Sequence, residues 1–186
     1  PGLLVDPGSR GNLSGSTWIR TAAAKAIHYG KRPSEERRKQ ALSVMGVGNG
    51  SQTCSHDVKM PITLTNAQGK PITGDFTTPV VDHSDLPALL GLQSLRDSRA
   101  ILDMGTLRLH FVGQGGAEIT LSPGSETFQC EISPSGHLVV PCCEYETEAK
   151  KNDTGSFSLN RQAPISLHTD TPSASSALSP EVHPEA

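Results

Sequence analysis

Two stretches of strict apolar–polar alternation lie close together in the chain, and they constrain its fold more than any other feature. The apolar residues of segment 58–64 alternate with polar residues or proline, and the alternation resumes over segment 72–80. A period of two places the apolar side chains on one face of a strand. A turn signal at 66–69 separates the two stretches. The pattern therefore predicts an antiparallel hairpin with one buried face.

One main helix is predicted before this hairpin. Segment 17–29 has apolar residues at helical spacing, Ser16 can cap its start, and Gly30 follows its end. Short apolar runs predict further strands, and a second, short helix is expected over 92–97. These strands lie at 3–5, 43–47, 100–102 and 107–111, with strand-like pieces in 117–145. The chain is therefore expected to be mostly β.

Charge and cysteine content exclude several classes of protein. The net charge of −3 argues against a nucleic-acid footprint over the whole domain. The densest charged run, 31–39, mixes both signs, which is typical of a solvated connector. No apolar run approaches the ~20 residues that a membrane span needs, and no signal peptide is visible. We therefore expect a cytoplasmic location with reduced cysteines, and no membrane partner.

An aspartate closes the first apolar run of the chain. Asp6 begins an Asp-x-Gly triplet, and Gly8 allows the backbone to approach closely behind the carboxylate. Two such carboxylates side by side share one proton, so that one activates a water and the other protonates the substrate carbonyl. The second triplet, at Asp153, has no strand ahead of it. A catalytic pair therefore requires a two-fold dimer, although Asp-Pro-Gly alone is more typical of a structural turn.

The order of motifs along the chain resembles that of retropepsin-like aspartic proteases. Segment 3–9 resembles the strand and active-site turn of the family, and 45–51 lies at the place of its flap hairpin. Segment 89–95, followed by the runs near 100 and 107, resembles the second half of that fold. The same order occurs in eukaryotic retropepsin-like ubiquitin adaptors. Segments 134–138 and 141–143 are similar to protease-like regions of Ty1/copia-type retrotransposon polyproteins.

The resemblance implies a fold and a division of the chain. The fold would be a mostly β, closed retropepsin-like barrel with one main helix and a disordered C-terminal tail. The retropepsin-like domain would span 1–112, a family extension with short strands 113–146, and the tail 147–186, where Ser, Thr and Pro dominate. Because the chain begins at Pro1 rather than Met, we expect it to be a fragment, a processed product or the product of an incomplete gene model.

The resemblance also implies an activity and a site. We expect an aspartic-type endopeptidase that cleaves polyprotein peptide bonds, acts as a homodimer, and needs no cofactor and no metal. Its partners would be a peptide or polyprotein substrate, with nucleic acid reached only through other parts of the parent polyprotein. The catalytic residue would be Asp6. The remaining site residues would be Pro7, Gly8 and Ser9 in the active-site turn, Gly46, Val47, Gly48, Asn49 and Gly50 in the flap, and Leu89, Leu90 and Gly91 as support.

Two substitutions relative to the family pattern, together with a segment of only five residues before Asp6 where relatives carry a longer one, keep a second hypothesis open. Pro7 replaces a Thr or Ser that the family uses to hydrogen-bond across the dimer, and Gln93 replaces a frequent acidic residue. The alternative is a catalytically degenerate retropepsin-like module that dimerises or binds peptide. A zinc site of Cys130, His137, Cys142 and Cys143 is disfavoured because the leading Cys-x-x-Cys of a zinc knuckle is missing.

Overall fold

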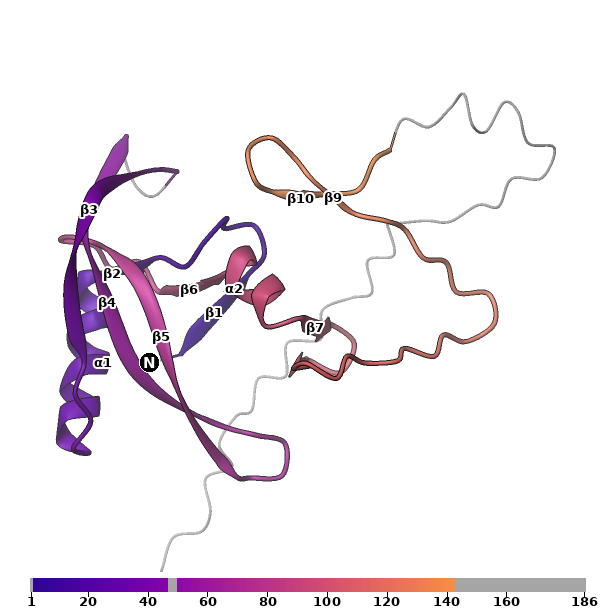
Figure 1. Cartoon of the computed structure of the whole chain (residues 1–186), viewed down its shortest axis with the longest axis horizontal. Coiled ribbons are helices and arrows are strands. Elements are labelled where there is room, and N and C mark those ends of the chain that lie inside the picture. The colour runs from indigo at the N-terminus through magenta and orange to yellow at the C-terminus, as the bar shows by residue number, and fades with distance from the viewer. Residues whose placement is uncertain (1, 47–49, 143–186) are drawn as a thin grey trace, which may run out of the picture. The chain divides into compact units, whose positions relative to one another are not determined.

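The computed structural model describes residues 2–46 and 50–142 (Figure 1). The chain divides into two units, Pro1–Cys143 and Glu144–Ala186. All described residues belong to the first unit. The predicted tail, 147–186, lies outside the described residues, as does the end of the predicted extension, 143–146.

A four-stranded sheet in the order β2-β5-β4-β3 contains the predicted hairpin. β4 (Ser51–Thr65) and β5 (Pro71–Val81) pair antiparallel from Asp57↔Pro79 to Thr65↔Pro71, which confirms the hairpin and lengthens both strands. The other two members are β2 (Ser14–Gly15), parallel to β5, and β3 (Ser34–Met45), antiparallel to β4.

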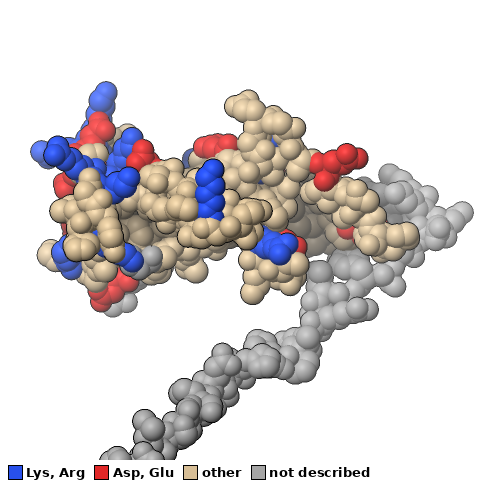
Figure 2. Space-filling model, turned by 90° about the horizontal axis from the view of Figure 1, so that it is seen from below, with Lys and Arg blue, Asp and Glu red and all other residues tan. Residues whose placement is uncertain are grey.

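The prediction of a connector at 31–39 was wrong, because β3 begins at Ser34. β3 is an edge strand, and only two of its residues, Arg38 and Val44, are even half-buried. Charged side chains can therefore project from both faces, and no apolar alternation arises. Figure 2 shows acidic and basic side chains mixed at the end of the molecule that carries β3 and α1.

The main helix, α1 (Ser16–His28), packs against the sheet and confirms the helix predicted over 17–29. Ala22 joins Val58, Met60 and Val80 in a buried apolar cluster between the helix and the strands. The Trp18 ring meets the Phe76 ring edge-on, with their centroids 5.9 Å apart. Burial of this apolar face, rather than helix propensity, stabilises α1 against the sheet.

The remaining strands form three two-stranded sheets. β1 (Leu3–Asp6) is parallel to β6 (Ala88–Gly91), which leads directly into α2 (Leu92–Asp97). β7 (Ala100–Asp103) pairs antiparallel with β8 (Arg108–Phe111). β9 (Glu131–Ile132) and β10 (Leu138–Val139) form a small hairpin within the predicted extension.

The expected closed barrel is not formed by the strands in the described part of the chain. β3 keeps a free edge, and β1 and β6 pair only with each other in a strand ladder. A barrel requires every strand to have a partner on both sides. The described fold is therefore mostly β with one main helix, in separate sheets. No helix in the part of the chain that the structure describes is long and apolar enough to cross a membrane.

Candidate active site

Asp6 lies at the end of β1, where the strand gives way to a tight turn. The β1–β6 register places Asp6 opposite Gly91, at the carboxyl ends of both strands. The apolar residues before Asp6 continue the strand, and Pro7 and Gly8 end it, because proline fixes φ and removes a donor. Two segments far apart in the sequence thus meet at the predicted catalytic residue.

The turn holds one oxygen of the Asp6 carboxylate. The backbone N–H groups of Gly8 and Ser9 donate to Oδ1, at 3.0 and 3.2 Å, and the Ser9 N–H also contacts the Asp6 carbonyl, at 3.1 Å. Oδ2 has no hydrogen-bond partner in residues 2–46 and 50–142. The side chain is half-buried. One oxygen is therefore oriented by the backbone, while the other is available to a second group.

The loop after Asp6 wraps closely around Gly91. A Cβ atom on Gly91 would lie 2.2 Å from the carbonyl oxygen of Gly11, so only glycine fits there. The Leu92 N–H donates to Ser9 O at 2.8 Å, and the Gln93 N–H donates to Arg10 O at 3.0 Å. These bonds attach the start of α2 to the Asp6 loop.

A second set of contacts closes the far side of this loop. Leu13 and Leu89 form an antiparallel bridge, with N–H···O distances of 3.3 and 2.7 Å. β6 therefore has a neighbour on each side. It pairs parallel with β1 on one side, and its Leu89 is bridged to Leu13 on the other. Leu89 is buried and Leu90 is half-buried.

Asn12 joins three elements around this crossing, and no sequence pattern predicts this role. Its side-chain Oδ1 accepts from the Gly91 N–H at 3.0 Å, and its Nδ2 donates to the Thr77 carbonyl of β5 at 2.9 Å. The two bonds span 79 and 65 residues of sequence. An asparagine in a Gly-rich loop usually hydrogen-bonds the backbone of its own turn. The sequence therefore gives no sign that Asn12 bonds to two distant strands.

The predicted flap lies at the tip of the β3–β4 hairpin. Met45 pairs with Ser51 as the last register pair, and Ser43 Oγ lies 2.6 Å from Ser51 Oγ. Gly46 and Gly50 have φ values of 84° and 81°, which suit glycine at a chain reversal. Val47, Gly48 and Asn49 lie outside the described residues.

The two departures from the family pattern are both exposed. Pro7 lies at the surface of the Asp6 turn, so its ring faces solvent in the single chain. Gln93 is exposed on α2, where its Nε2 donates to Asp97 Oδ1 at 2.8 Å. Gln93 therefore acts locally within the helix through its side chain, while its backbone N–H contacts the Asp6 loop.

The other nucleophile and metal candidates do not assemble into sites. Cys54 is fully buried, and burial raises the pKa of its thiol, an effect that the nearby Arg38 opposes. His56 contacts the hydroxyl of Ser55 rather than the Cys54 thiol, with 3.3 Å between His56 Nδ1 and Ser55 Oγ. His137 Nδ1 contacts Ser135 Oγ at 2.8 Å. Within the described ranges no three His, Cys, Asp or Glu side chains gather as metal ligands, and Cys143 lies outside them.

Comparison with solved structures finds a weak likeness to a retroviral protease-like domain. The chain is similar to the crystal structure of the retroviral protease-like domain of Ddi1 from Leishmania major, with 19% sequence identity and a TM-score of 0.38. The match covers 60% of this chain and 78% of that chain. No protein-family model and no curated protein sequence matches.

Proposed function

We propose that this chain is a retropepsin-like aspartic endopeptidase of a retrotransposon polyprotein, in which Asp6 supplies half of a catalytic dyad. The pairing of Asp6 with Gly91 carries the proposal. It joins the Asp-x-Gly turn to the apolar strand and glycine of the second half, two motifs that the family resemblance also associates. The backbone bonds to Oδ1 orient the carboxylate, and Oδ2 is left to meet a second carboxylate.

The chemistry follows from two Asp6 side chains related by a two-fold axis. Two carboxylates in contact share one proton, because both cannot ionise at short range. The ionised aspartate takes a proton from a water, whose oxygen attacks the carbonyl carbon of the peptide bond. The protonated aspartate gives its proton to the carbonyl oxygen, which forms a tetrahedral gem-diol. The aspartate that took the water proton then protonates the nitrogen, the C–N bond breaks to release the amine, and the other aspartate takes back a proton from the gem-diol to leave the carboxylic acid. A single chain offers one such aspartate, so the active species is a homodimer.

The β3–β4 hairpin would serve as the flap that covers the substrate. An extended peptide would bind at such a site by adding as a strand, through main-chain hydrogen bonds. The glycines at the ends of the tip, Gly46 and Gly50, permit its sharp reversal.

The direct test is a peptide-cleavage assay on the full chain and two matched variants. Asp6→Asn is nearly isosteric but cannot exchange the shared proton, so cleavage should be lost while the circular dichroism spectrum is unchanged. Asp153→Asn alters the other Asp-x-Gly triplet and should leave the rate unchanged. The specific activity of the parent should fall on dilution, as the dimer dissociates. Equal activity of Asp6→Asn and the parent would refute the proposal.

The second candidate function is a degenerate retropepsin-like module that binds peptide or dimerises without cutting. Pro7 favours it, because this exposed residue offers neither a hydroxyl nor an N–H to a partner turn. Under this alternative, an uncleaved peptide should bind the parent and Asp6→Asn with equal affinity, and neither protein should show turnover at high concentration.

A further inference from the structure

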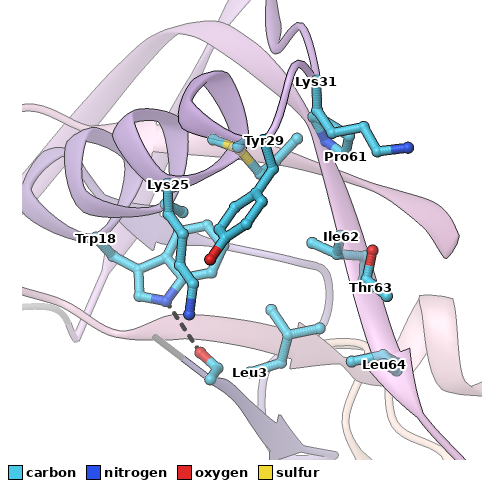
Figure 3. Close-up of a pocket in the computed structure, with 13 residues that line it drawn as sticks. Leu3, Trp18, Lys25, Tyr29, Lys31, Pro61, Ile62, Thr63 and Leu64 are labelled. Atoms are coloured by element: carbon cyan, nitrogen blue, oxygen red, sulfur yellow. Dashed lines mark hydrogen bonds between the residues drawn. The ribbon is translucent and has the colours of Figure 1, made fainter. Parts of the chain in front are cut away.

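An apolar groove lies between α1 and β4, on residues that the proposed protease site does not use. It has a volume of about 480 Å³, and its apolar lining includes Trp18, Met60, Ile62 and Leu64 (Figure 3). The Trp18 Nε1–H donates to the Gly2 carbonyl at 2.9 Å, which holds the indole at the end of the groove nearest β1. Met60 is fully buried beneath it, whereas Leu64 is 46% exposed.

One wall of the groove is an unpaired strand edge. β3 pairs with β4 only as far as Ser34↔Lys59, so β4 continues beyond it with β5 on one side alone. The strand ladders of the described chain place no further strand against residues 60–65 of β4. These same residues line the groove up to Leu64. An extended chain could therefore lie against β4 in line with β3.

The proline positions show which backbone groups this edge presents. Every second β4–β5 pair is a non-hydrogen-bonded pair, in which neither residue donates its N–H to the partner strand. The prolines of the two strands all lie in this set, at Pro61, Pro71 and Pro79. The pair Thr63↔Thr73 belongs to the same set. Thr63 therefore directs its N–H and C=O away from β5 and toward the groove side. Pro61 offers its carbonyl there, but no donor.

The rim of the groove is cationic. Lys25 projects from α1, and Lys31 lies over Pro61 at the other end, beyond the exposed Tyr29 (Figure 3). Neither lysine forms an ion pair with any described residue. Among the residues that the structure describes, no acidic side chain lines the groove. An apolar floor, a free strand edge and unopposed positive charge together specify an extended, acidic, amphipathic ligand.

We propose that this groove binds an extended acidic peptide, which adds as a strand to the β4 edge at Thr63 and directs apolar side chains toward Ile62 and Met60. Its carboxylates meet Lys25 and Lys31. A second copy of the chain is a poorer occupant, because pairing two β4 edges would bring the lysines of both copies together. The β3 edge lacks these features, since it has a break in register between Arg37 and Leu42 and charges of both signs.

The test uses a defined probe and an intrinsic reporter. The probe is an acetylated, amidated octapeptide of alternating glutamate and leucine, with lysine replacing glutamate in the control peptide. Trp18 is the only tryptophan of the chain and lines the groove, so its fluorescence reports binding. The acidic peptide should give a saturable change that weakens with added salt. The basic peptide should bind at least tenfold more weakly.

Matched proline variants test the strand edge. Thr63→Pro removes the one N–H that the edge offers inside the groove and should weaken binding about tenfold, the worth of a net hydrogen bond. Thr73→Pro makes the same change on the opposite strand and should leave binding unchanged. Lys25→Glu combined with Lys31→Glu should also weaken binding of the acidic peptide at least tenfold. Circular dichroism and urea midpoints establish that each variant folds.

Three results would overturn the proposal. The first is no change in Trp18 fluorescence with the acidic peptide at millimolar concentration. The second is equal loss of binding in folded Thr63→Pro and Thr73→Pro. The third is concentration-dependent self-association, seen by sedimentation, that Thr63→Pro abolishes and Thr73→Pro does not. That last result would assign the edge to a second copy of the chain.

Discussion

Asp6 and Gly91 are register partners at the carboxyl ends of two parallel strands, and the loop that begins at Asp6 closes around Gly91. The carboxylate is thereby tied to the start of α2 through backbone bonds at Ser9 and Arg10. The position of Asp6 depends on a crossing that tolerates no side chain on Gly91. The close contact between Gly91 and the Asp6 loop can be tested without any knowledge of the substrate.

Replacing Gly91 by alanine should destabilise the fold strongly. The added Cβ would lie 2.2 Å from the Gly11 carbonyl oxygen, a backbone atom that cannot move aside alone. We expect a loss of about 2–3 kcal/mol in the free energy of unfolding, measured in urea. Gly74→Ala is the matched control, because its Cβ meets nothing within 4 Å, and its stability should be unchanged or slightly raised. Equal urea midpoints for the two variants would contradict the crossing.

Asn12→Ala should lower both stability and cleavage rate. It removes the bonds to Gly91 and Thr77 and leaves the part-buried Gly91 N–H without this acceptor, at a cost of about 1–3 kcal/mol. Asn66→Ala also removes two bonds, those from the Gln68 and Lys70 N–H groups, but in the β4–β5 turn. Both variants should therefore lose stability, and only Asn12→Ala should lower kcat under conditions where both are folded. A normal kcat for Asn12→Ala would show that Asn12 does not position the Asp6 loop.

Pro7→Thr should strengthen the proposed dimer. Threonine restores a hydroxyl and an N–H at an exposed position of the Asp6 turn. One added net hydrogen bond is worth up to about tenfold in dimer affinity or in activity. Sedimentation and cleavage should be measured over a dilution series. If neither the parent nor Pro7→Thr cuts any peptide at high concentration, the degenerate binding module is the better assignment.

Asp103 should make the β7–β8 turn sensitive to acid. Hydrogen bonds from Thr106, first from its hydroxyl and then from its backbone N–H, lower the pKa of the exposed Asp103 carboxyl below its ordinary value. A lowered folded-state pKa stabilises the fold above the unfolded-state pKa, and this stabilisation is lost as pH falls through the folded value. Thr106→Val should raise the pKa of Asp103 toward the ordinary value of an aspartate, as followed by carboxyl NMR titration. An unchanged titration in Thr106→Val would contradict the assigned cause.

The sequence by itself determined the elements whose partners lie nearby. The helix predicted over 17–29 forms as Ser16–His28, and the hairpin over 58–64 and 72–80 forms within longer strands. Both elements have one buried face, so their apolar residues recur along the sequence at the period of a helix or a strand. β3 was predicted only at its end, by the strand expected at 43–47, because the rest of it is exposed on both faces as an edge strand, and exposed positions impose no period.

Only the tertiary structure decided how the parts around Asp6 meet. The parallel pairing of β1 with β6, the fit of Gly91 within the loop and the two bonds of Asn12 all join residues far apart in the chain. Such contacts depend on which backbone groups come within hydrogen-bonding distance after folding, and a single residue type does not encode that. The closed barrel that the resemblance implied is not formed by the strands of residues 2–46 and 50–142, for the same reason. The apolar pattern of the sequence predicts which segments form strands. Only the tertiary packing decides which strand edges pair with one another.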